Sequence, residues 1–163
     1  MGIAELQPLW VIALLATIAL TGAVYDLRFR RIPNWLCGLA LASGIAVAFL
    51  DQAGSPASHG LHAFLALVVG LLFFGLKMLG GGDVKFYTGL ASFFPLAQGA
   101  LLLLCVSISG MLLVAVWFVS RRLAGIPMRK KSAAKSDELP YGIAIATGAV
   151  WVYAGTWWVE GLV

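Results

Sequence analysis

Apolar residues form six runs along the chain, and polar or charged residues separate the runs. A helix that crosses a hydrocarbon core of about 30 Å needs about 20 mostly apolar residues, and five of the runs lie near this length. The fourth run is shorter, so we expect it to begin inside the membrane or to form only part of a span. The runs cover residues 8–25, 35–50, 61–79, 84–94, 96–119 and 140–159.

The composition excludes a soluble globular domain. Hydrophobic residues make up 61% of the 163 residues and charged residues only 11%, and the mean hydropathy is +0.96. Soluble domains carry about 25% charged residues. We therefore expect an all-α polytopic membrane protein with about six transmembrane helices, the fourth of them short, and a single membrane-embedded domain over residues 1–163.

The distribution of charge predicts the topology. All eleven Lys and Arg residues lie in three segments, residues 28–31, 77–85 and 121–135. Alternate connections therefore carry all of the positive charge or none of it, which indicates positive-inside orientation with both termini outside the cytoplasm. The net charge of +4 would also suit a nucleic-acid partner. Because a cytoplasmic loop beside anionic headgroups gathers basic residues in any case, we expect no such partner.

Several candidate sites are weak. Cys37 and Cys105 are predicted at different depths, too far apart for a disulfide, and we interpret both as packing residues. His59 and His62 belong to no HExxH motif, and an ordinary junction between the outer loop and a helix explains them. Ser109 lacks the preceding glycine and the histidine base that an intramembrane serine protease needs. We expect neither a metal nor a cofactor.

Two aspartates remain as candidates, because an ionisable group at membrane depth is costly. Asp26 ends the first apolar run in YDLRFRR, and Asp83 follows three glycines in LGGGDVK. Each has an ordinary explanation: Asp26 balances nearby arginines, and Asp83 is the N-cap of the next helix. The predicted topology places both near one depth on the cytoplasmic side, however, and a Gly-Gly-Gly stretch lets another backbone approach closely. The two carboxylates can therefore meet, and whether they lie together without substrate stays open.

These motifs together resemble the type IV prepilin peptidases, which are membrane aspartic proteases. YDLRFRRIPN is followed by GGGDVK, which contains a GxGD motif, and LPYGIAIATGA is similar to the final helix of the small members associated with Tad or Flp pilus systems. The resemblance implies Asp26 and Asp83 as the catalytic pair. It also implies a supporting role for Gly80, Gly82, Lys85, Arg31, Pro33, Asn34, Pro140, Tyr141 and Gly142. For Lys85, Arg30 and Arg31, topology alone is the favoured explanation, with tuning of the site or contact with lipid phosphate as alternatives.

The resemblance implies an endopeptidase of the bacterial inner membrane that removes a short basic leader from pilin precursors at the cytoplasmic face. Larger members also methylate the new N-terminus through a domain with paired CxxC motifs, and no CxxC is present here. We thus expect no methyltransferase activity. The substrate would be a membrane-inserted pilin precursor in the lipid bilayer. The oligomeric state stays open.

The expected mechanism is acid-base hydrolysis without a covalent intermediate. Asp83 would lie at a helix N-terminus and Asp26 at a C-terminus, so the helix dipoles favour Asp83 as the base and Asp26 as the acid. Three alternatives remain open. They are a presenilin-like protease that cuts inside the bilayer, a small transporter that moves cations or protons along Asp26 and Asp83, and a structural subunit of an export machine.

Overall fold

The computed structural model describes residues 3–50, 55–125 and 139–160, and within them every regular element is a helix. The predicted all-α fold is confirmed, including the short fourth helix, which has 11 residues. The elements in chain order are α1 (Ile3–Phe29), α2 (Asn34–Ala48), α3 (Pro56–Gly75), α4 (Gly81–Ala91), the 3-10 helix η1 (Leu96–Gln98), α5 (Gly99–Leu123) and α6 (Tyr141–Glu160).

The third helix, Pro56–Gly75, begins and ends earlier in the chain than the predicted run over residues 61–79. Its ends are set by capping interactions and not by the apolar run. Ser55 is the N-cap and accepts a hydrogen bond from the Ser58 amide, and a proline stands in the first turn. At the other end Lys77 has a φ of 59°, and the Met78 amide donates to the Phe73 carbonyl at 3.0 Å. This closes a Schellman motif, so the helix ends while the apolar run continues.

The fourth helix begins three residues earlier than its apolar run. Gly80 is the N-cap, and Asp83 lies inside the first turn of α4. The interpretation of Asp83 as the N-cap residue is therefore wrong. The glycines, which have no side chains to bury, form the start of the helix, and they place Asp83 three residues beyond the N-cap position.

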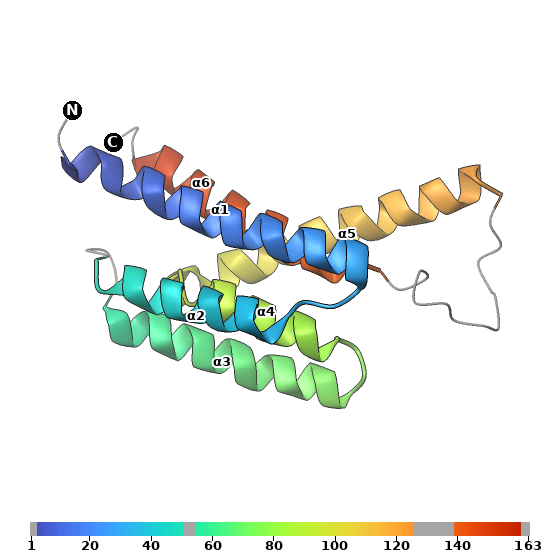
Figure 1. Cartoon of the computed structure of the whole chain (residues 1–163), viewed down its shortest axis with the longest axis horizontal. Coiled ribbons are helices and arrows are strands. Elements are labelled where there is room, and N and C mark those ends of the chain that lie inside the picture. The colour runs from blue at the N-terminus through green and yellow to red at the C-terminus, as the bar shows by residue number, and fades with distance from the viewer. Residues whose placement is uncertain (1–2, 51–54, 126–138, 161–163) are drawn as a thin grey trace.

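The helices form two layers of three (Figure 1). In one layer α6 packs against both α1 and α5, and in the other α4 packs against both α2 and α3. The central helices α4 and α6 contact each other and join the layers. Gly22 of α1 leaves room for the ring of Phe86 of α4, which is fully buried and directly touches the position that a Cβ at residue 22 would occupy.

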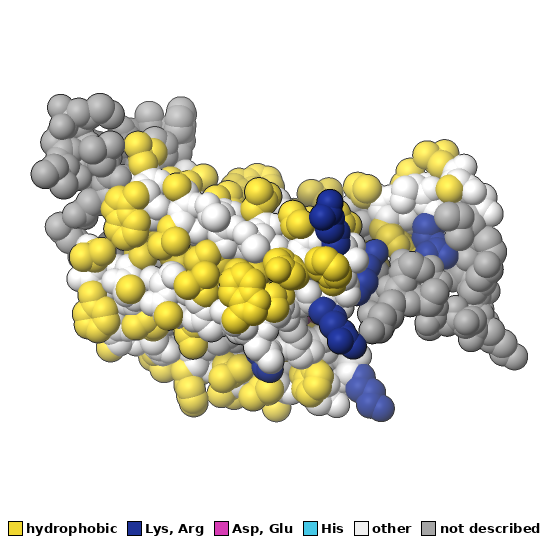
Figure 2. Space-filling model, viewed as in Figure 1, with side chains coloured by type: hydrophobic (Ala, Val, Ile, Leu, Met, Phe, Trp, Pro, Cys, Tyr) yellow, Lys and Arg dark blue, Asp and Glu magenta, His cyan; other side chains and the backbone are white. Residues whose placement is uncertain are grey.

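The surface fits a lipid environment. Leu9–Phe29, Pro56–Gly75 and Leu96–Leu123 are long and apolar enough to cross a membrane, and Asn34–Ala48 and Tyr141–Gly155 are shorter apolar helices. Large apolar side chains are exposed along these helices, for example Leu72 and Met111. Figure 2 shows that the Lys and Arg side chains gather toward one end of the molecule, where α1 leads into α2 and α3 into α4.

Candidate active site

Asp26 lies in the last turn of α1 and is bound by the first turn of α6. Its side chain is 7% exposed, and its Oδ2 accepts a hydrogen bond from the Gly142 amide at 2.8 Å. The amides of a first helical turn have no partners within their helix, so they readily bind a carboxylate. Gly142 permits this contact, because a Cβ there would lie 3.0 Å from Oδ2 and 3.1 Å from Cδ1 of Ile32.

Asp83 lies in the first turn of its own helix, α4. It is half-buried, and its Oδ2 folds back toward the N-cap residue, since a Cβ at Gly80 would lie only 2.8 Å from it. A larger residue at position 80 would displace this oxygen. Gly82 has a looser environment, because a Cβ there would lie 3.7 Å from the Ile32 amide.

The two aspartates line one cavity of about 330 Å³ at the end of the molecule where the basic residues gather. The cavity lies between the layers, because Asp26 belongs to the α1–α6–α5 layer and Asp83 to the α2–α4–α3 layer. A water molecule takes about 30 Å³ of liquid, so the cavity has room for several waters or for a peptide segment. The lining residues are Asp26, Arg30, Arg31, Ile32, Asn34, Gly80, Gly81, Gly82, Asp83 and Leu139.

Arg30 ends α1 in a left-handed conformation, with a φ of 52°. Its amide donates to the Asp26 carbonyl at 2.9 Å, which closes the helix, and the chain then turns toward α2. The guanidinium Nη1 is buried and has no hydrogen-bond partner among the described residues. A charged donor beside the carboxylates therefore has hydrogen-bonding capacity to spare.

The start of α2 is tied to α4. Pro33 is the N-cap of α2, and Nζ of Lys85 donates to Oδ1 of Asn34 at 3.1 Å. Both of these polar side chains are exposed, so the bond contributes little to stability, but it fixes the α1–α2 connection beside the first turn of α4.

Residues 13–115 match the type IV leader peptidase family. This match covers more than half of the chain. The chain belongs to the type IV leader peptidase family. It is therefore a peptidase, and its substrates are of the pilin-precursor type in general. No curated protein and no solved structure matches the chain.

The leader peptidase match includes both aspartates but ends before α6. The hydrogen bond from Gly142 to Asp26 thus joins the matched region to the final helix. Pro140, which is buried, directly precedes α6. Tyr141 lies apart from the carboxylate cavity: its hydroxyl lies 2.9 Å from where a Cβ at Gly110 of α5 would stand.

The structure changes the argument about acid and base. Asp26 was expected at the C-terminus of its own helix, and it lies there, but its carboxylate also contacts the N-terminus of α6. Asp83 also lies at a helix N-terminus. Since both carboxylates have an N-terminal helix dipole beside them, the dipoles no longer distinguish a base from an acid.

The histidines and cysteines that the sequence offered as weaker candidates lie outside the carboxylate cavity. His59 and His62 are buried in α3, and Nδ1 of each ring lies 3.0 Å from a backbone carbonyl, that of Ser92 and that of Phe94 respectively. These bonds tie α3 to the connection between α4 and α5, a role that the sequence did not indicate. Cys37 and Cys105 are free thiols. Among the described residues no three His, Cys, Asp or Glu side chains gather in a way that could hold a metal ion.

Proposed function

We propose that the protein is an aspartic endopeptidase that removes the basic leader from pilin precursors at the cytoplasmic face of the inner membrane. The observation that carries the proposal is the shared cavity, because it has Asp26 and Asp83 in its lining and is large enough for water. Family membership supports the peptidase chemistry. The clustering of basic side chains at the same end supports the cytoplasmic placement (Figure 2).

Each carboxylate has one task in the proposed hydrolysis. The ionised one removes a proton from a water molecule, whose oxygen attacks the scissile carbonyl carbon. The protonated one donates to the carbonyl oxygen, and a tetrahedral diol forms. Collapse of the diol breaks the C–N bond, and a proton passes to the leaving amine. Two carboxylates within about 3 Å of each other share one proton, which gives the pair the required mixed state.

The surrounding groups support these steps. The Gly142 amide holds Oδ2 of Asp26 in place through its hydrogen bond. Arg30 lines the cavity, and its buried Nη1 has no hydrogen-bond partner among the described residues; we propose that this donor turns to a backbone carbonyl of the bound substrate. The supporting residues predicted from the motifs then act through position, as Lys85 does by holding Asn34 at the start of α2.

The proposal predicts that Asp26→Asn and Asp83→Asn each abolish cleavage. Asparagine keeps the side-chain volume but neither takes up nor releases the proton, so turnover should fall by at least about a hundredfold. Purified protein in lipid is given a pilin precursor, and the cleaved fraction is followed over time. The amount of each variant in the membrane is the control. Near-normal turnover in either variant would remove that residue from the mechanism.

A further inference from the structure

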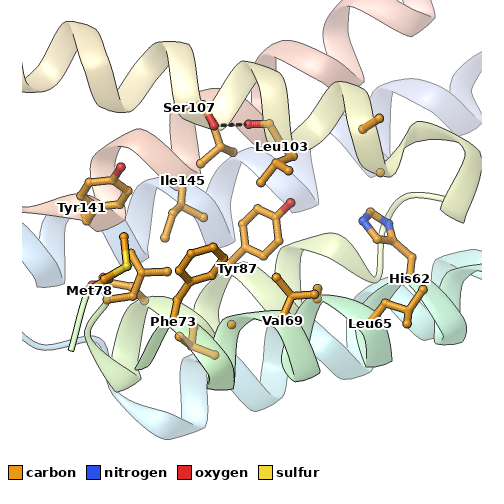
Figure 3. Close-up of a pocket in the computed structure, with 18 of the residues that line it drawn as sticks. His62, Leu65, Val69, Phe73, Met78, Tyr87, Leu103, Ser107, Tyr141 and Ile145 are labelled. Atoms are coloured by element: carbon orange, nitrogen blue, oxygen red, sulfur yellow. Dashed lines mark hydrogen bonds between the residues drawn. The ribbon is translucent and has the colours of Figure 1, made fainter. Parts of the chain in front are cut away.

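A second cavity, of about 510 Å³, lies between α3 and α5. Its floor is formed by α4 and α6, which contact each other, while the walls α3 and α5 share no extended contact. Figure 3 shows Val69 and Phe73 on one wall, Leu103 and Ser107 on the other, and the ring of Tyr87 pointing between them. We call this cavity the α3–α5 groove.

The α3–α5 groove is apolar, and its walls are exposed at the protein surface. Leu65, Val69 and Phe73 of α3 are 40%, 48% and 39% exposed, and Leu103 of α5 is 58% exposed. Two of its polar side chains are bonded within the protein: Ser107 donates to the Leu103 carbonyl at 2.7 Å, and Nδ1 of His62 lies 3.0 Å from the Phe94 carbonyl. Such a surface suits an apolar helix, because a helix satisfies its own backbone groups and offers only apolar side chains to its neighbours.

The groove leads to the proposed active site. Asp83 lines both the carboxylate cavity and the groove. Tyr87, one turn further along α4, continues the same face into the groove. From Phe73, near this end, the lining follows α3 to His62, a distance of about 17 Å at 1.5 Å per residue. The groove is thus long enough for about half of a membrane-crossing helix.

We propose that the α3–α5 groove binds the transmembrane helix of the substrate, with the N-terminal end of that helix at Asp83. This inference rests on the proposed peptidase function. Continuity with the carboxylate cavity favours a peptide helix over a lipid chain as the occupant, because only a peptide leads from the groove to a scissile bond. The groove then sets the register of cleavage, since the first residue outside it is the one beside the aspartates.

Bulky substitutions in the groove test the proposal against matched neighbours. Val69→Trp and Leu103→Trp fill the groove, whereas Val68→Trp and Leu104→Trp place the same ring on neighbouring exposed positions, 39% and 56%, that do not line it. We expect the groove variants to raise KM for a membrane-inserted precursor about tenfold, from the cost of overpacking, with kcat little changed. The neighbouring variants should match the wild type. Equal KM values for all four variants would overturn the proposal.

Photo-crosslinking gives a second test that does not depend on turnover. A photoreactive phenylalanine analogue is introduced at position 69 or 103, or at the matched position 68 or 104, in the Asp83→Asn background. Adducts with the hydrophobic segment of the precursor from 69 and 103, and not from 68 and 104, support the proposal. Adducts with lipid only, from all four positions, would overturn it. Failure of the wild type to cut the precursor would instead contradict the proposed function, and the crosslinks would still report on the groove.

Discussion

Each carboxylate of the proposed pair lies against a glycine whose missing side chain makes room for it. Oδ2 of Asp83 lies 2.8 Å from where a Cβ at Gly80 would stand, and Oδ2 of Asp26 lies 3.0 Å from the same point at Gly142. At Gly80 the nearest atom is the carboxylate oxygen itself, and at Gly142 the Asp26 oxygen, the Asp26 Cβ and Cδ1 of Ile32 all lie within 3.1 Å of that point. A methyl group at position 80 would therefore move the Asp83 oxygen, and one at position 142 would press on the whole Asp26 side chain.

We predict that Gly80→Ala and Gly142→Ala reduce kcat strongly. A displacement of about 1 Å at a reacting group costs about a hundredfold in rate, and the close contacts at both glycines require smaller shifts than that, so a loss of about tenfold is expected here. Gly38→Ala is the control, because a Cβ at Gly38 meets nothing within 4 Å. Cleavage of a pilin precursor is measured for all three variants in lipid. Normal kcat in the Gly142→Ala variant would show that the contact between Asp26 and α6 is not needed.

Among the described residues, Arg30 and Lys77 are the non-glycine residues with positive φ. Left-handed backbone costs an L-residue about 1–2 kcal/mol, so both positions hold strain. Arg30 lines the carboxylate cavity, whereas Lys77 is exposed and lines neither cavity. The two residues have the same backbone conformation, but only Arg30 is placed to act on a substrate.

Glycine substitutions at these two positions should separate stability from activity. Arg30→Gly and Lys77→Gly are each expected to stabilise the protein by about 0.5–1 kcal/mol, because glycine adopts positive φ without strain. Only Arg30→Gly should slow cleavage, since it removes the buried donor. Thermal unfolding in detergent and precursor cleavage are measured together. Lys77→Ala loses the same charge but keeps the Cβ, so a gain in stability there would contradict the strain argument.

At the scale of the elements, the apolar pattern located the helices but not their ends. The apolar pattern predicted six helices, of which the fourth is short. Lipid-facing and buried positions are both apolar, so each helix appears as a continuous apolar run. The ends of α3 depend instead on Ser55 and Lys77. The hydrogen bond between Gly142 and Asp26 joins residues 116 positions apart, and only the packing of α6 against α1 brings them together. No periodicity in the sequence contains that information.

The contacts of the two histidines of α3 were likewise not predictable from the apolar pattern. His59 was interpreted as part of a loop-to-helix junction, but it is fully buried, and its ring bonds the Ser92 carbonyl beyond the end of α4. The short α4 has few hydrogen bonds of its own, so ties at its C-terminal end should matter for stability. This end lies away from Asp83, which is in the first turn.

We predict that His59→Phe destabilises the protein by about 1–3 kcal/mol, because it leaves the buried carbonyl of Ser92 without its donor. Phenylalanine has a similar ring, so loss of volume does not explain the change. Unfolding in a mixed-micelle titration gives the free energy. His59→Asn keeps a donor near the Nδ1 position and loses the ring, and comparison of the two variants separates the hydrogen bond from packing. Wild-type stability in the Phe variant would mean that the bond contributes nothing.

At the scale of the whole molecule, the proposed site lies where the two layers meet. Asp26 is in the last turn of α1 and Asp83 in the first turn of α4, and the basic side chains gather at the same end (Figure 2). If this end faces the cytoplasm, both carboxylates lie at the membrane border and not at its centre. Two carboxylates held at the membrane border can cleave only a peptide bond that lies at the border.

The border position predicts where a substrate is cut. Backbone hydrogen bonds shield the amides of an intact helix, and opening them in the bilayer costs several kcal/mol per group. The scissile bond should therefore lie just before the hydrophobic helix, with the basic leader held in the cytoplasm. A precursor whose cleavage motif is moved six residues, about 9 Å, into the helix should be cut more than about tenfold more slowly than the natural arrangement. Both precursors are offered to the purified protein in lipid. Equal rates would place the working site inside the bilayer, as in a presenilin-like protease, and the layers would then have to open to admit an unwound helix between α1 and α4.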